Sequence, residues 1–212
     1  MLHPSTEIRR RDDQVGYGIF ATAPIPKGTL TWVLDGMDQI LGMQHVEQMD
    51  SVSRDQLIKY SYLNGRGDRI LCWDLTRFMN HHCEANILSP GLPVEIAVRD
   101  IQEGDELTND YGALNIEDDF ECACGSLLCR GIVRDSDFEE LAPRWDLQIR
   151  EAAQRAPLVP QPLASWLARQ QGVLELFRFP DQVPSVLKNR WRRVETMMPI
   201  ADGTLRFSRG IR

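Results

Sequence analysis

The sequence predicts a mainly β front region followed by a mostly helical tail, on two observations. Up to residue 112, short apolar or alternating runs lie between glycines and prolines, which is typical of strands joined by turns: GYGIFAT, GTLTWVL, RILCWDL, PVEIAVR and DELTNDY. After Asp135 the apolar residues recur at helical spacing, as in RWDLQIREAAQR. A chain of 212 residues is long enough for one folded unit with an extension.

The front region is expected to contain five strands and one short helix. The strands are expected over residues 16–22, 28–34, 69–75, 93–99 and 105–111, and the helix near Asp55–Tyr60. Cys72 and Trp73 lie in the apolar run RILCWDL and are expected in the core.

The tail is expected to begin with a capped helix. Ser136 followed by Glu139 has the pattern of a capping box, and Pro143 marks a place where a second helix could begin. The run APLVPQP then breaks the chain, and two short helices are expected in LASWLARQQ and SVLKNRWRRVETM. The basic patch KNRWRR, residues 188–193, suits a solvated face or an intramolecular partner for the acidic front region better than a nucleic-acid site.

Composition and charge narrow the function classes. Hydrophobic residues make up 42% of the chain, and no apolar run approaches the roughly 18 residues that cross a bilayer. The start, MLHPSTEIRRRDD, lacks the apolar segment of a secretory signal, so a cytoplasmic location at synthesis and no membrane partner are expected. Residues 1–134 carry 12 Lys and Arg against 21 Asp and Glu, a net charge of −9. This acidic part argues against direct nucleic-acid binding and is compatible either with a basic partner or simply with solubility.

The cysteines predict a metal site. Cys122, Cys124 and Cys129 form the pattern C-x-C-x4-C, so three thiolates on a tight turn could occupy three corners of a zinc tetrahedron. The fourth ligand must come from elsewhere in the chain. Cys83 in RFMNHHCEAN is the leading candidate, with His81 and His82 as rivals, and the alternative is a set of unrelated buried thiols.

Four motifs resemble, in order, those of SET-domain protein lysine methyltransferases with a cysteine-rich post-SET segment: GYGIFA (16–21), RFMNHHCEAN (77–86), ELTNDYG (106–112) and CACGSLLCRG (122–131). The resemblance implies a SET-type β-clip fold of short twisted sheets with a pseudoknot. It also implies a zinc-bound post-SET loop and leaves an α-helical C-terminal extension. The expected boundaries are 5–112 for the SET domain, 113–134 for the post-SET zinc segment and 135–212 for the extension.

The resemblance implies S-adenosylmethionine and Zn²⁺ as cofactors. The cofactor-binding residues it implies are Gly16, Tyr17, Gly18, Arg77, Phe78, Asn80, His81 and Tyr111. The zinc ligands it implies are Cys83, Cys122, Cys124 and Cys129. Glycines suit the cofactor loop, because a backbone without Cβ atoms can approach a ligand closely.

Tyr111 matches the tyrosine that the family places at the methyl-transfer centre. A lysine amine with a pKa of about 10.4 must become neutral to attack, so a desolvated, aromatic-walled channel is expected to lower its pKa and align it. Tyr60, Tyr62 and Asn109 are the expected channel residues. Asn109 occupies a position that the family associates with the number of methyl groups added, and that number cannot be read from the sequence. Without the motif, Tyr111 would read as an ordinary tyrosine at a strand end.

The expected function is methyl transfer to lysine in a basic protein segment, such as a histone-like tail or a ribosomal protein. The alternatives are a non-catalytic binding module with the same fold and a methyltransferase acting on a small free amine. The full set of cofactor residues argues against the binding module.

Overall fold

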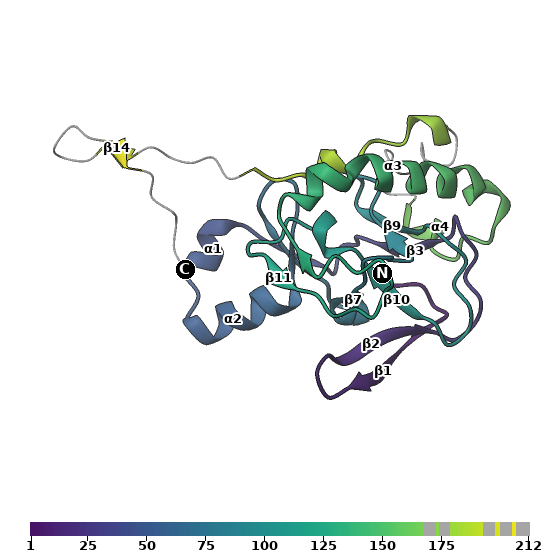
Figure 1. Ribbon diagram of the computed structural model, residues 1–212, viewed down its shortest axis with the longest axis horizontal. Coiled ribbons are helices and arrows are strands. Elements are labelled where there is room, and N and C mark those ends of the chain that lie inside the picture. Colours follow the sequence, from purple (N-terminus) through teal and green to yellow (C-terminus); the bar gives the residue numbers. More distant parts are fainter. Residues whose placement is uncertain (168–172, 174–178, 193–197, 200–204, 207–212) are drawn as a thin grey trace.

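The computed structural model describes residues 1–167, 173, 179–192, 198–199 and 205–206, and within them the architecture is mainly β, with curled sheets (Figure 1). The largest sheet has the strand order β1-β2-β10-β8-β9-β3, with β7 pairing β10. Its strands are β1 (Thr6–Asp12), β2 (Gly16–Ala21), β3 (Leu30–Val33), β7 (Asn80–His81), β8 (Ile87–Leu88), β9 (Val94–Ala97) and β10 (Glu106–Asn109). β10 pairs in parallel with both β7 and β8, so the segments around residues 80 and 109 lie side by side.

The remaining strands of the described residues form three small sheets. They are formed by β4 (Gln39–Leu41), β6 (Arg69–Leu71) and β5 (Tyr62–Leu63); by β11 (Phe120–Glu121) and β12 (Ile132–Val133); and by β13 (Met198–Pro199) and β14 (Leu205–Arg206). The mainly β front region is thus confirmed.

The helices of the described residues are mostly short. The α-helices are α1 (Met43–Glu47), α2 (Ser51–Tyr60), α3 (Asp137–Arg155) and α4 (Ala164–Leu167). The 3₁₀ helices are η1 (Leu75–Phe78), η2 (Tyr111–Ala113), η3 (Ala156–Leu158), η4 (Pro180–Gln182) and η5 (Val186–Asn189). In this part of the chain none of them has the length and apolarity to cross a bilayer.

The α2 helix is longer than the sequence pattern suggests. It begins at Ser51, because the side chain of Asp50 accepts a hydrogen bond from the backbone N–H of Ser53 at 2.9 Å and so satisfies the first turn. The expected helix near Asp55–Tyr60 covers only its second half.

The α3 helix packs on the sheet and shares its core (Figure 1). Phe138, Trp145 and Ile149 are at most 3% exposed and belong to one hydrophobic cluster with Leu30 and Ile96. Burial of apolar area is the main stabilising term in such a contact. The start of the tail therefore folds together with the strands.

Two expectations for α3 are wrong. Ser136 precedes the helix, but it has helical backbone angles and its side chain makes no capping bond, so there is no capping box. The Asp137 carboxylate instead accepts from the backbone N–H of Arg134 at 3.1 Å. Pro143 does not start a second helix, because α3 runs through it; burial of one whole helix face outweighs the single hydrogen bond that proline lacks.

The two residues of RILCWDL expected in the core differ in their outcome. Cys72 is 3% exposed, whereas the prediction for Trp73 is wrong, since Trp73 is 37% exposed. Its indole N–H donates to Asp35 at 3.1 Å. β6 ends at Leu71, so the alternation of a strand no longer directs Trp73 inward.

The basic patch forms intramolecular ion pairs, but with the start of the tail and not with the acidic front region that the sequence analysis proposed as its partner. Arg190 donates to Asp135 at 2.6 and 2.7 Å and to Glu139 at 2.9 Å. Its guanidinium carbon also lies 5.2 Å from the ring centroid of Phe138. These ion pairs hold η5 against the start of α3, while Arg193 lies outside the described residues.

We expect Arg190→Met to lower the free energy of unfolding by about 1–2 kcal/mol, because it removes charge-assisted hydrogen bonds to half-exposed carboxylates and keeps the apolar stem. Urea unfolding at 25 °C measures this change. Arg192→Met is the matched control, because Arg192 is 79% exposed and lies 3.7 Å from Glu139. Equal effects of the two substitutions would show that the Arg190 ion pairs contribute nothing.

Candidate functional site

A cavity of about 380 Å³ lies between the small sheet of β5 and β6 and the ends of β9 and β10. Five residues expected at the site line it: Tyr60, Tyr62, Arg77, Asn109 and Tyr111. They come from α2, β5, η1, β10 and η2, so folding gathers residues that are up to 51 positions apart in the chain.

Tyr111 is held in one orientation. Its hydroxyl donates to the carbonyl oxygen of Met79 at 2.7 Å, and its ring lies 5.5 Å from that of His81 and 6.2 Å from that of Phe120. Burial, and then the charges of Glu106 and Glu95, raise the pKa of Tyr111 to about 12. The phenol therefore keeps its proton at neutral pH and acts as a hydrogen-bonding group, not as an ionised base.

Aromatic rings connect the cavity to the turn between β1 and β2. The ring of Tyr60 lies 5.8 Å from that of Phe78, which lies 6.2 Å from that of Tyr17. Arg77 lies beside this row: its guanidinium donates to the carbonyl oxygen of Trp73 at 2.8 Å and its central carbon is 5.9 Å from the centroid of Phe78. Four residues from three separate segments of the chain thus form one row of contacts.

The glycine turn has a bare backbone for a physical reason. Gly16 has φ +87°, a conformation that favours glycine, and a Cβ at Gly18 would collide with the Glu106 carboxylate. Asn80 uses that closeness: its amide donates to the carbonyl oxygen of Tyr17 at 2.9 Å and to Glu106 at 2.7 Å. A Cβ at Gly16 would meet no atom within 4 Å, so the backbone at Gly16 is open to a ligand, and the Asn80 amide fixes the neighbouring carbonyl of Tyr17.

His81 joins this surface to the cysteines. Burial, aided by the charges of Arg130 and His82, lowers the pKa of His81 to about 4, so the imidazole is neutral. Its Nδ1 accepts the backbone N–H of Tyr111 at 3.1 Å, which leaves the proton on Nε2, 3.4 Å from the sulfur of Cys83. One ring thus hydrogen-bonds to both the tyrosine backbone and a thiol.

Four cysteine sulfurs form a cluster that could hold a metal ion: Cys83, Cys122, Cys124 and Cys129, all within 4.8 Å of one another. The sulfurs of Cys83 and Cys122 are 3.8 Å apart, which is about the edge of a tetrahedron with Zn–S bonds of about 2.3 Å. The backbone N–H of Gly131 contacts the sulfur of Cys129 at 3.5 Å and lowers its pKa to about 7. The rivals for the fourth position, His81 and His82, are not members of this cluster.

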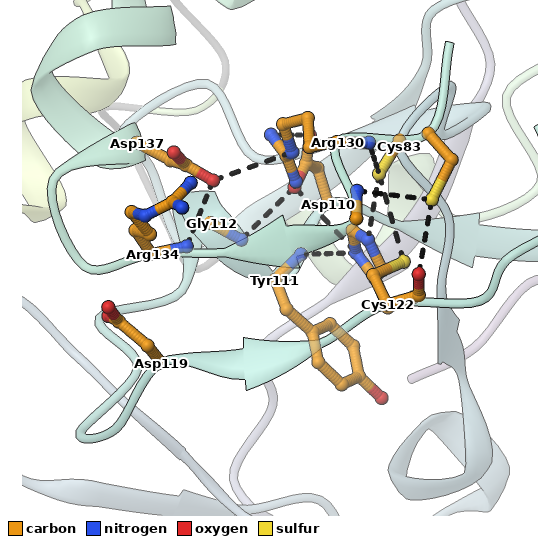
Figure 2. A network of polar contacts seen from close by, with 12 residues as sticks. Cys83, Asp110, Tyr111, Gly112, Asp119, Cys122, Arg130, Arg134 and Asp137 are labelled. Atoms are coloured by element: carbon orange, nitrogen blue, oxygen red, sulfur yellow. Dashed lines mark hydrogen bonds and ion pairs between the residues drawn. The ribbon is translucent and has the colours of Figure 1, made fainter.

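A buried ion pair ties the cysteine loop to the tyrosine (Figure 2). Both terminal N–H groups of Arg130 donate hydrogen bonds to the Asp110 carboxylate, at 2.6 and 3.1 Å, and Asp110 is 1% exposed. Asp110 also accepts the backbone N–H of Gly112 at 3.1 Å. Arg130 follows Cys129 in the chain, and Asp110 precedes Tyr111. The ion pair therefore links the conformation of the cysteine loop to the position of Tyr111.

Comparison with known proteins identifies the family. The family model described as "SET domain" matches residues 16–112. Residues 16–112 thus match the SET domain family. The cysteine cluster that follows it is consistent with a post-SET segment.

The alignments with curated relatives cover only a small part of those proteins' length. Histone-lysine N-methyltransferase ATX2 of Arabidopsis thaliana is 28% identical over 138 residues, covering 59% of this chain and 13% of the relative. Histone H3-lysine(4) N-trimethyltransferase ATX1 of the same plant is 32% identical over 158 residues, covering 62% and 14%. The crystal structure of the methyltransferase domain of human histone-lysine N-methyltransferase SETMAR aligns with a TM-score of 0.44 and 21% identity, over 63% of this chain and 58% of that one.

Several residues of the SET domain site escaped the sequence analysis. Glu95 and Trp32 line the cavity, and each lies inside an apolar run that was expected only to form a strand. The glutamate in the apolar run PVEIAVR could have pointed to a site at this strand, because a charged residue is seldom fully buried without a partner. Asp110 and Arg130 each lie within a quoted motif, but nothing in the sequence pairs them.

Proposed function

We propose that this protein is an S-adenosylmethionine-dependent protein-lysine N-methyltransferase. The match of residues 16–112 to the SET domain supports it, as do relatives named as histone-lysine N-methyltransferases. The observation that carries the proposal is the Tyr111 hydroxyl, held 2.7 Å from the carbonyl oxygen of Met79, in a residue that lines the 380 Å³ cavity. A non-catalytic module would have no need for this combination.

Different residues of the site would bind the cofactor and the substrate. S-adenosylmethionine supplies, when bound, a methyl group activated on a sulfonium. The backbone of residues 16–18 would hold it, and the Asn80 amide, which donates to the carbonyl oxygen of Tyr17, would fix the position of that backbone. Tyr111 would orient the lysine amine in line with the methyl group, while Tyr60 and Tyr62 exclude water from the channel.

Zinc is the metal that we propose for the cysteine cluster. A set of four thiolates at tetrahedral spacing suits a closed structural zinc site with no position open to substrate. Its role is to fold the loop that carries Arg130, and with it the contact to Asp110.

A basic protein segment is the proposed substrate. The net charge of −9 over residues 1–134 favours a cationic partner, and the exposed Asp118 lines the cavity. Histone-like tails and ribosomal proteins both fit this description, so the assay must include both.

The test is transfer of radiolabelled methyl groups from S-adenosylmethionine to histones, ribosomal proteins and a cell lysate. We expect labelled protein bands, and at least a tenfold lower rate for Tyr111→Phe, which removes the hydroxyl and keeps the ring. Calorimetry with S-adenosylmethionine is the control, because the variant should bind the cofactor as the wild type does. Absence of both label and cofactor binding would leave the binding module, whereas label confined to small molecules would indicate a free amine substrate.

A further inference from the structure

Residues 185–191 of the C-terminal extension pack against the turn that joins β5 to β6. A Cβ at Gly65 would lie 3.1 Å from the backbone of Asn189, and a Cβ at Gly67 would lie 2.6 Å from the indole ring of Trp191. The extension therefore approaches this turn more closely than a side chain at either position would allow. β5 and β6 both contribute residues to the lining of the cavity, so the extension lies directly behind one of its walls.

Asn115 joins the extension to the cavity. It lines the cavity, is 4% exposed and has φ +54°. Its amide N–H groups donate to the carbonyl oxygens of Leu63 at 3.0 Å and Asn189 at 2.7 Å, and its side-chain oxygen accepts from the backbone N–H of Trp191 at 2.8 Å. Each polar group of this buried amide thus has a partner, which holds the side chain in one orientation.

These hydrogen bonds connect two walls of the cavity. Leu63 and Arg69 belong to the wall formed by β5 and β6, and residues 114–118 form the wall that faces them. The hydrogen bond from Asn115 to Leu63 and the ion pair of Arg69 with Glu117 both run from one wall to the other. Through Asn115, the extension is bound to both walls.

Tyr111 is anchored separately from this connection. Its hydroxyl donates to the carbonyl oxygen of Met79 at 2.7 Å, and its backbone N–H donates to His81 at 3.1 Å. Neither contact involves residues 185–191. Loss of the Asn115 hydrogen bonds should therefore change the separation of the walls more than it changes the orientation of the Tyr111 hydroxyl.

We propose that Asn115 is a positioning residue for methyl transfer: together with Asn189 and Trp191 of the C-terminal extension, it fixes the two walls of the cavity at the separation that a lysine side chain requires. This proposal rests on the proposed methyltransferase function. It gives residues 185–191 a role in substrate binding, although they lie behind the cavity. It predicts a larger effect on KM for the protein substrate than on kcat.

The first test is the kinetics of Asn115→Gly with a peptide that carries the site labelled in the methylation assay. Glycine suits the backbone conformation at φ +54°, so this variant removes the side-chain hydrogen bonds without adding backbone strain. We expect KM for the peptide to rise roughly fivefold or more, and kcat and KM for S-adenosylmethionine to stay within about twofold of the wild type.

Two further variants complete this test. Trp191→Ala removes the indole that packs on Gly67 and should raise KM for the peptide in the same way. Leu163→Ala is the control, because Leu163 is 2% exposed in the core of the extension but does not line the cavity, so its loss should leave KM unchanged. A fall confined to kcat in Asn115→Gly, or an equal rise in KM with Leu163→Ala, would overturn the proposal, since either would indicate general destabilisation.

The second test needs no turnover, so it separates this proposal from the methyltransferase function. Hydrogen exchange followed by mass spectrometry should be roughly fivefold or more faster over residues 62–68 and 114–118 in Asn115→Gly and Trp191→Ala, and unchanged over residues 16–21. Unchanged exchange over residues 62–68 would overturn the proposal even if methyl transfer is established. Faster exchange in a protein that transfers no methyl groups would support the Asn115 connection and count against the methyltransferase function instead.

Discussion

Replacing Cys83 with serine is expected to lower the affinity of the protein for zinc by more than 100-fold. Cys83 lies in the SET domain, 39 residues before Cys122, and its sulfur is 3.8 Å from that of Cys122. A lost ligand should cost more than the tenfold to 100-fold that a changed outer-shell partner costs. The cysteine loop would then lose one of its attachments to the strands.

Methyl-transfer activity is expected to fall when the metal is lost. Arg130 lies next to Cys129 in the loop, so an unfolded loop would no longer place the guanidinium on Asp110, which accepts from Gly112 beside Tyr111. We expect methyl transfer to drop at least tenfold in Cys83→Ser and after treatment of the wild type with a chelator. Metal content by mass spectrometry and the thermal unfolding temperature report the first effect, and radiolabel transfer reports the second.

Cys72→Ser is the matched control for the metal. Cys72 is a buried free thiol outside the cluster, so its loss should leave the zinc content unchanged. A Cys83→Ser protein that keeps one zinc per chain at wild-type affinity would contradict the four-cysteine site. It would point to His81 or His82 as the fourth ligand.

The second large effect is on stability: Glu95→Gln should stabilise the protein at alkaline pH but much less at acid pH. Burial raises the pKa of Glu95 to about 7 from 4.5, although the hydrogen bond from Asn109 lowers it. Between these values the folded state holds a proton that the unfolded state has released, so stability falls as the pH rises. Ionisation of Glu95 thus costs roughly 3 kcal/mol above pH 7, and glutamine avoids that cost.

Urea unfolding at pH 5.5 and pH 8.5 measures this effect without acid loss of the metal. The difference in unfolding free energy between Glu95→Gln and wild type should grow by about 2 kcal/mol between the two pH values. Asp74, which raises the pKa of Glu95, and the amino group of Met1, which lowers it, are present in both proteins. Glu103→Gln should give a difference that does not change with pH; a constant difference for Glu95→Gln as well would mean that Glu95 is not buried and ionised.

The amino-acid sequence by itself determined the elements whose signals are local. The strand patterns, the change to helical spacing after Asp135 and the clustered cysteines 122, 124 and 129 are all readable over a few residues, and the structure agrees with them. The helix signals were less reliable: Ser136 and Pro143 each have a local meaning, but the burial of α3 against the sheet overrides it.

Only the tertiary structure decided the contacts between distant segments. It brings Cys83 to the other three cysteines, Arg130 to Asp110 and Glu95 to Asn109. The physical reason is that burial and pairing depend on neighbours in space: a Glu in an apolar strand has the same local sequence whether it faces solvent, packed core or a cavity. The parallel pairing of β7 and β8 with β10, which no spacing in the sequence specifies, sets those neighbours and therefore the site.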